Sequence, residues 1–275
     1  MLMENQGTDQ GNSFPQMKDV AIVLAFTFGL TIVAALIGAL FLGTTELLLT
    51  EIIIILPAIF FVRSHKQDHV RVFRLFLPGK QVIFSSLLIA FGTIVLTDEL
   101  DRLIQKFFPM PDFLLESLEE LMKIDSTSEL VIIVFSAVIV AGLCEEMLFR
   151  GFVQQAFENK MDAARAIVYS SLIFAIVHFN IWTALQITIL GLVLGYMSWR
   201  SDSIIPGAIL HGLNNGMAVL FINLGEERTA WYSTGDHVGF IWIASAAVAL
   251  FFGFKLFERG TTLDLEQENI NSGID

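Results

Sequence analysis

The stretch that decides the fold is "LVIIVFSAVIVAGL", residues 130–143, followed directly by "CEEMLFRGF", residues 144–152. The first fourteen residues carry no charge, and a run of this kind is typical of a helix inside a lipid bilayer. Two glutamates and an arginine, Glu145, Glu146 and Arg150, then appear before any loop has begun. Because ionisable side chains inside a membrane are costly, this segment is a candidate functional site on a membrane-spanning helix.

The rest of the chain has the same apolar character. Of its 275 residues 55% are hydrophobic, and the mean hydropathy is +0.68. The apolar residues lie in runs of about 20, the length that spans a bilayer. The sequence therefore predicts an all-α, polytopic membrane helical bundle of about eight transmembrane helices. The predicted segments are 19–43, 45–63, 81–97, 130–150, 163–180, 181–199, 204–224 and 238–257.

The positive charges predict the orientation, because Lys and Arg concentrate in cytoplasmic segments. With the N-terminus in the cytoplasm, 12 of the 16 Lys and Arg residues fall on the inside. We therefore expect a multi-pass protein of the cell membrane with both termini cytoplasmic. The expected divisions are a polar cytoplasmic tail at 1–18, a transmembrane domain at 19–258 and an acidic cytoplasmic tail at 259–275. The four outside cations are Arg102, Lys106, Lys123 and Arg228.

Two connecting segments have a pattern of their own. The outer loop 98–129 is acidic, and its stretch "FLLESLEELMKI", 113–124, has apolar residues on one helical face. It is expected to be an amphipathic helix that either lies on the outer surface of the membrane or packs against the protein. The inner loop 64–80 is basic and partly apolar, so attraction to anionic lipid is expected there.

The spacing of the three charges suggests separate roles. Glu146 and Arg150 are four residues apart, so on a helix they share a face and can form a pair. Glu145 points about 100° away, which leaves it free to face a cavity. The alternative is that all three charges mark a cytoplasmic helix end among lipid headgroups.

Two histidines favour the cavity. A helical hairpin that turns near 159–162 brings Glu145 and His178 to a similar depth. His211 reaches that depth if the hairpin extends into the cytoplasm, and it shares a face with Asn215, as Phe174 does with His178. A lone membrane histidine more often bonds two helices together. The convergence of these groups instead supplies a general base and oxyanion donors, which suits hydrolysis of an amide.

One more acid lies in an apolar segment. Glu51, in "LLLTEIIIILP", residues 47–57, fits none of these spacings. We interpret it as a buried packing residue or a proton-linked residue outside the site.

Three short motifs give the chain a family resemblance. "EEMLFRG" at 145–151 matches the pattern EExxxR, "FAIVH" at 174–178 matches FxxxH, and "HGLNN" at 211–215 matches HxxxN. Together and in this order they resemble the CPBP family, the CAAX-protease and bacteriocin-processing intramembrane proteases, also called the Abi family. The resemblance covers roughly residues 130–220.

The resemblance implies a role for each motif residue. It implies an intramembrane endopeptidase that cleaves a membrane-associated protein or peptide, in CAAX-type or leader and bacteriocin processing. Glu145 and His178 would activate the attacking water. His211 and Asn215 would stabilise the oxyanion, the Glu146–Arg150 pair would support the site, and Phe174 would line it.

The resemblance also bears on a metal cofactor and on the partners of the protein. The family is often called a metalloprotease, and a divalent metal such as zinc would find three ligands in Glu145, His178 and His211. A glutamate-activated water needs no metal, and the chain has no HExxH motif, so both mechanisms stay open. The expected partners are a peptide or protein substrate and the lipid bilayer, and no nucleic acid. The alternatives are a non-catalytic bacteriocin self-immunity protein and a proton-linked transporter.

Overall fold

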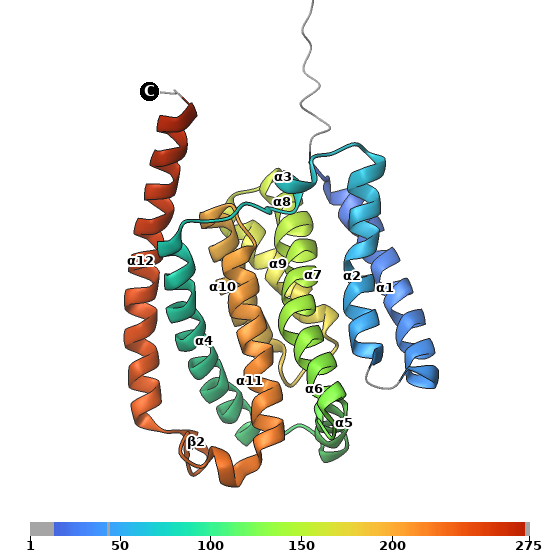
Figure 1. Cartoon of the computed structure of the whole chain (residues 1–275), viewed down its shortest axis with the longest axis vertical. Coiled ribbons are helices and arrows are strands. Elements are labelled where there is room, and N and C mark those ends of the chain that lie inside the picture. The colour runs from blue at the N-terminus through green and yellow to red at the C-terminus, as the bar shows by residue number, and fades with distance from the viewer. Residues whose placement is uncertain (1–13, 43–44, 273–275) are drawn as a thin grey trace, which may run out of the picture.

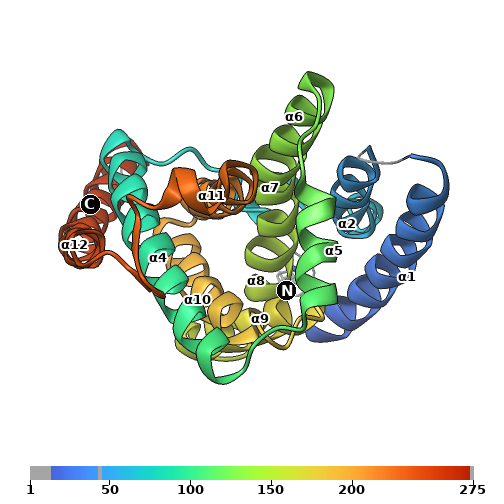
Figure 2. The ribbon, with the colours of Figure 1, turned by 90° about the horizontal axis from the view of Figure 1, so that it is seen from below.

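The computed structural model describes residues 14–42 and 45–272, and within them the chain is almost entirely helical (Figures 1 and 2). The α-helices are, in order, α1 (Met17–Phe41), α2 (Thr45–Ser64), α3 (His69–Val72), α4 (Lys80–Phe107), α5 (Asp112–Met122), α6 (Thr127–Val134), α7 (Ala141–Glu146), α8 (Gln154–Glu158), α9 (Ala163–Val177), α10 (Ala184–Ser201), α11 (Ile205–Thr229) and α12 (Phe240–Ser272). A two-stranded hairpin of β1 (Ser233–Thr234) and β2 (His237–Val238) precedes α12.

The predicted membrane bundle is confirmed. Within the described residues six helical stretches are long and apolar enough to cross a membrane: Met17–Gly38, Thr45–Ser64, Lys80–Phe107, Thr127–Glu158, Ile205–Gly225 and Phe240–Asp264. The other two predicted segments correspond to α9, a shorter apolar helix of 15 residues, and to α10, which is not among the six. The structure thus supports six spans, and the figure of about eight stays a prediction.

Long antiparallel pairs build the bundle. Helices α1 and α2 pack together at one edge, and α4 and α12 at the other, with the remaining long helices between them (Figure 1). The start of α1 and the end of α12 lie at the same end of the bundle (Figure 1). This agrees with termini on one side of a membrane, whereas the side itself remains a prediction.

The boundaries of the two tails stay predictions. Most of the predicted N-terminal tail, residues 1–13, lies outside the described residues. In the predicted C-terminal tail, 259–275, helix α12 continues to Ser272.

The central helix is continuous but not uniform. From Thr127 to Glu158 the chain stays helical, and two π-helical segments, Phe135–Val140 and Met147–Val153, lie on either side of α7. π-Helical turns are rare and occur frequently at functional sites. The span predicted at 130–150 thus extends further at both ends. Glu145 and Glu146 lie on α7, between the two π segments.

Helix α4 runs ten residues beyond the predicted end of its span at residue 97. Its outer charges are paired and do not end the helix. Asp98 and Arg102 form an ion pair one turn apart, with 3.1 Å between Nε and Oδ2. Glu99 accepts a 2.7 Å hydrogen bond from the backbone N–H of Val238 and another from the His237 ring. These bonds attach the β-hairpin to α4.

The outer segment 113–124 is helical as predicted up to Met122, where α5 ends. Helix α5 has no buried residue, so its sides are open. Its C-terminal end is fixed to α11 by Asn223, which donates to the Met122 carbonyl at 2.9 Å and accepts from the Ile124 backbone N–H at 2.8 Å. The segment is thus tied to the protein at one end.

The inner loop 64–80 contains one cation that turns inward. Arg74 is 5% exposed and donates to the Arg150 backbone carbonyl at 3.3 Å. It also forms ion pairs with Asp202 and Glu158. Arg74 therefore holds together the ends of α8 and α10 instead of meeting lipid headgroups.

Close backbone packing positions α11. A Cβ atom added at Gly212 would lie 2.3 Å from the Val138 carbonyl oxygen of the first π segment. Only glycine allows this approach, which explains the small-residue spacing Gly212–Gly216 in the sequence. The approach brings His211 against the central helix.

Candidate active site

The site is built on three elements of the bundle. The C-terminal end of α7 supplies Glu145 and Glu146, and the π segment that follows supplies Arg150. Helix α9 supplies Phe174, and His178 is its C-cap. Helix α11 supplies His211 and Asn215. Of these, Glu145, Glu146, Arg150, Phe174 and His211 are all buried.

A buried ion pair forms the base of the site. Arg150 Nη1 donates to Glu146 Oε1 at 2.9 Å, and the two side chains are 1% and 0% exposed. The same carboxylate oxygen accepts a hydrogen bond from His211 Nδ1 at 3.0 Å. Since the charges are fully buried, they do not lie among lipid headgroups at a helix end. The structure instead makes Glu146 the link between Arg150 and His211.

The second glutamate faces both histidines. Glu145 Oε2 lies 4.0 Å from His178 Nε2 and 4.0 Å from His211 Nε2. This oxygen is buried and has no hydrogen-bond partner within the described part of the chain. Glu145 thus takes no part in the Arg150 pair, as its angular offset on the helix predicts.

The ring nitrogens that face Glu145 are fixed by bonds on the opposite side of each ring. His178 Nδ1 lies 2.7 Å from the Phe174 carbonyl, which can only accept, so Nδ1 carries a proton. The Nε2 atom of a neutral His178 is therefore an acceptor. His211 Nδ1 donates to Glu146, so its Nε2 atom donates only when the ring holds two protons.

One aromatic ring contacts most of the site. The Phe174 ring packs edge-on against His178 at 4.7 Å and against His211 at 5.7 Å between ring centroids. The Arg150 guanidinium carbon lies 4.1 Å from the centroid of the same ring. Phe174 thus lines the site, keeps the two imidazoles apart and stabilises the buried cation.

Asn215 lies one turn beyond His211 and is half-buried. Its Nδ2 atom donates to the Ala137 carbonyl at 3.1 Å, in the first π segment. No hydrogen bond joins it to Glu145 or to either histidine within the described residues. One amide hydrogen is thus already used to hold α11 against the central helix.

The structure adds one residue that the motifs do not contain. The Glu51 carboxyl group, on α2, lies close enough to the Glu145 carboxyl group for the two to interact electrostatically. Its Oε2 atom is buried and has no hydrogen-bond partner within the described residues. The structure therefore brings Glu51 beside Glu145, although the spacing of the motifs does not predict it. The signal for it was present, since an acid in a membrane span is expected to have a partner.

The residues do not fit a metal centre well. Zinc binds nitrogen and carboxylate oxygen at about 2.0–2.2 Å, usually with three protein ligands. The described residues include no group of three or more His, Cys, Asp or Glu side chains arranged to hold a metal ion. In the proposed trio, His211 already bonds Glu146 through Nδ1, and the Nε2 atoms of both histidines lie 4.0 Å from Glu145 Oε2, beyond the distance of shared metal ligation. We therefore derive no catalytic step through a metal.

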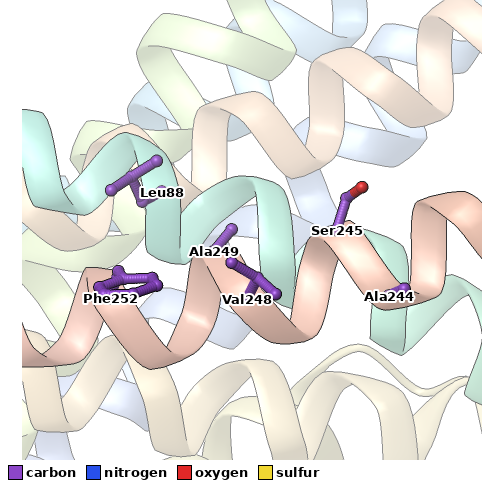
Figure 3. Close-up of a pocket in the computed structure, with 6 residues that line it drawn as sticks. All are labelled: Leu88, Ala244, Ser245, Val248, Ala249 and Phe252. Carbon is purple, nitrogen blue, oxygen red and sulfur yellow. The ribbon is translucent and has the colours of Figure 1, made fainter.

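Two hollows differ in their chemistry. A cavity of about 160 Å³ has Glu145 and His178 in its wall, together with residues of α1 and α2. A shallower pocket of about 520 Å³ lies on α4 and α12 (Figure 3). Its lining is apolar except for Ser245, and it contains none of the ionisable groups of the site. Only the first hollow is connected to the chemistry described above.

The comparison with protein families agrees with this geometry. Residues 127–217 match the family model described as "Type II CAAX prenyl endopeptidase Rce1-like". The match supports a CPBP/CAAX intramembrane protease family. The matched segment is about a third of the chain, and it runs from the start of α6 into α11, so the CAAX-protease segment includes all three motifs. No curated protein and no solved structure matches the chain.

Proposed function

We propose that the chain is an intramembrane endopeptidase that hydrolyses a peptide bond of a membrane-associated protein or peptide. The observation that carries the proposal is the position of Glu145 Oε2, 4.0 Å from the Nε2 atoms of both His178 and His211. The match to the CAAX-protease family supports the reaction class. A CAAX-type substrate or a leader peptide would reach the site from the membrane.

In the proposed reaction, Glu145 and His178 act on the attacking water. A water about 2.8 Å from Glu145 Oε2 and from His178 Nε2 donates one hydrogen to each. Its lone pairs then face the substrate carbonyl carbon. As the new C–O bond forms, Glu145 takes the proton, and that proton later passes to the leaving amine. The C–N bond breaks, and the products are a carboxylic acid and an amine.

His211 is proposed to stabilise the negative oxygen that forms on the carbonyl. For this its Nε2 atom must carry a proton, and Glu146 favours that state by accepting from Nδ1. Arg150 neutralises Glu146, so the buried carboxylate does not need a proton of its own. Asn215 is proposed as a second donor, through its remaining amide hydrogen.

Two other functions make different predictions. A non-catalytic self-immunity protein would retain its function when Glu145 is neutral. A proton-linked transporter would lose ion flux when Glu145 is neutral. It would produce no cleaved peptide, with or without that change. The family match favours hydrolysis over both.

The proposal can be tested without knowing the substrate. Membranes containing the active protein are compared with membranes containing Glu145→Gln, and all new peptide termini are identified by mass spectrometry. The active protein should generate termini that the variant does not. The matched control is Glu116→Gln, the same change on the exposed side of α5, which should leave the termini unchanged. Identical termini from the active protein and Glu145→Gln would overturn the proposal.

A further inference from the structure

One face of α12 has two pockets that follow one another along the helix. The apolar pocket of about 520 Å³ is lined on α12 by residues within 244–252, and a second pocket of about 800 Å³ by residues within 255–263. The lining residues recur every three or four positions, so they share one helical face. Helix α4 supplies Leu88 to the first pocket (Figure 3) and Gln81, two turns earlier, to the second. The two pockets thus form one groove, the α4–α12 groove.

The second pocket has an excess of positive charge. Its wall contains Arg200 of α10 and Lys255 and Arg259 of α12, with Glu258 as its one carboxylate. None of these three cations forms an ion pair within the described residues. The Glu258 carboxylate accepts a hydrogen bond from the Tyr196 hydroxyl at 3.1 Å. Three cations and one carboxylate leave a net charge of two positive units, which suits an anionic ligand.

Hydrogen bonds between helices hold this cationic pocket in shape. Arg200 Nη2 donates to the Thr262 hydroxyl at 2.9 Å and to the Glu258 backbone carbonyl at 3.5 Å, which joins α10 to α12. Gln81 Nε2 donates to the Leu256 carbonyl at 2.9 Å, which joins α4 to α12. The other N–H groups of Arg200 have no partner within the described residues. They are available to an anion that enters the pocket.

The groove has the length of one membrane leaflet. Ser245 and Lys255 are ten residues apart, which is about 15 Å along a helix. The hydrocarbon core of a bilayer is about 30 Å thick, so one leaflet accounts for about 15 Å. The cationic pocket lies toward the end of α12 that shares its side of the bundle with the start of α1 (Figure 1). With the cations at the headgroups on that side, Ser245 lies near the middle of the bilayer.

We infer that the α4–α12 groove binds one anionic phospholipid, with its phosphate in the cationic pocket and an acyl chain in the apolar pocket. Arg200, Lys255 and Arg259 donate charge-assisted hydrogen bonds to the phosphate oxygens. Basic pockets between membrane helices on the cytoplasmic side, the predicted side of this one, are typical sites for anionic headgroups. The inference is independent of the proposed function, because neither pocket includes Glu145 or a motif histidine.

The test measures lipid binding to the full chain, purified in detergent, by native mass spectrometry. The probes are dioleoylphosphatidylglycerol, which is anionic, dioleoylphosphatidylcholine, which has the same acyl chains and no net charge, and inorganic phosphate. The phosphatidylglycerol should occupy one saturable site and bind at least tenfold more tightly than the phosphatidylcholine. Inorganic phosphate, which has no acyl chain, should bind at least tenfold more weakly than the phosphatidylglycerol.

One pair of variants tests the headgroup contacts. Lys255→Gln with Arg259→Gln removes two of the three cations and should weaken phosphatidylglycerol binding at least tenfold. The matched control is Arg63→Gln with Lys66→Gln, the same two changes at exposed positions at and just after the end of α2. This control changes the net charge equally and should bind the lipid like the unchanged chain.

A second pair tests the acyl-chain contacts. Ala249→Trp fills the apolar pocket and should weaken phosphatidylglycerol binding at least tenfold, although every cation is retained. The matched control is Ala247→Trp, the same change at an exposed position of α12 that lines neither pocket. It should leave the affinity unchanged. This pair gives the answer if the double charge variant does not fold.

Each contrary result would overturn the inference. Equal affinities for the two lipids would show that the charge of the headgroup is not recognised. Inorganic phosphate that binds as tightly as phosphatidylglycerol would identify a soluble anion as the ligand. Equal losses in a variant and its matched control would show general attraction to the protein surface, and unchanged binding in both groove variants would place the lipid elsewhere.

Discussion

Replacing Arg150 with alanine tests the buried base of the site. Arg150 is fully buried, and its partner Glu146 is 0% exposed. The substitution leaves the Glu146 carboxylate with His211 Nδ1 as its remaining hydrogen-bond donor within the described residues. It also removes the guanidinium from the Phe174 ring and from the Gly191 carbonyl. The variant therefore has a buried charge without its counter-charge.

The expected cost is large compared with protein stability. Removing one partner of a buried ion pair destabilises a protein by about 3–5 kcal/mol. The free energy of unfolding is commonly about 5–15 kcal/mol. For a chain of this size such a loss corresponds to a fall in Tm of roughly 10 °C. We expect lower yield and a lower Tm, with loss of cleavage.

The assay is thermal unfolding of the purified protein in one detergent, and tryptophan fluorescence is the signal that is measured. The control is Arg165→Ala, which breaks an ion pair three residues apart whose side chains are 72% and 55% exposed. Exposed pairs contribute about 0–1 kcal/mol, so its Tm should change little. The double variant Glu146→Leu with Arg150→Leu removes both charges and should recover much of the lost stability. It should remain inactive, because His211 loses its acceptor.

The reasoning would be refuted by an Arg150→Ala protein with the Tm and activity of the unchanged chain. That result would place Glu146 in contact with water in solution. A double variant as unstable as the single one would also contradict the explanation, because then the loss would come from packing and not from the unpaired charge.

Four shorter predictions follow from other contacts. Glu51→Leu should lower kcat with little change in KM, while Glu51→Gln, which can still donate a hydrogen bond, should retain most activity; equal activities of the two would refute a role in positioning. Asn215→Ala should reduce cleavage by about 10²–10³, as for loss of one oxyanion donor, and an unchanged rate would remove it from that role. A chelator should leave cleavage by the purified protein unchanged, and loss of cleavage restored by zinc would contradict the geometric argument against a metal centre. In a chain with Cys144→Ala, an impermeant thiol reagent on intact cells should label Ser126→Cys and not Ser64→Cys, and the reverse pattern would invert the topology.

The sequence predicted the meeting of the motif residues for a simple reason. Helix rise and a short turn fix the depths of Glu145 and His178 on an antiparallel hairpin, and the structure brings both near His211. The offset of Glu145 from Glu146 followed from the same helical period. The catalytic roles of these residues remain proposals.

Other features depended on contacts that no local pattern contains. Glu51 lies on α2, and nothing in its own segment indicates that α2 packs against α7 at the depth of Glu145. The length of α4 was underestimated because Asp98 and Arg102 resemble the end of a span, although they pair within the helix. The π segment Phe135–Val140 has an ordinary apolar sequence, so its wider turn could not be predicted from residue type.

The two π segments have a further consequence for insertion and deletion along this helix. A π turn bonds residues five apart, so it holds one residue more than an α turn. Deletion of one residue inside Phe135–Val140 would let that turn close as an ordinary α turn, without breaking the helix. Because the shortened turn still completes one rotation, the residues beyond it would keep their direction relative to the preceding residues. The same deletion in an ordinary α-helical turn of this helix would rotate Glu145 by about 100°, so the π segments are the places where a change in length leaves the site intact.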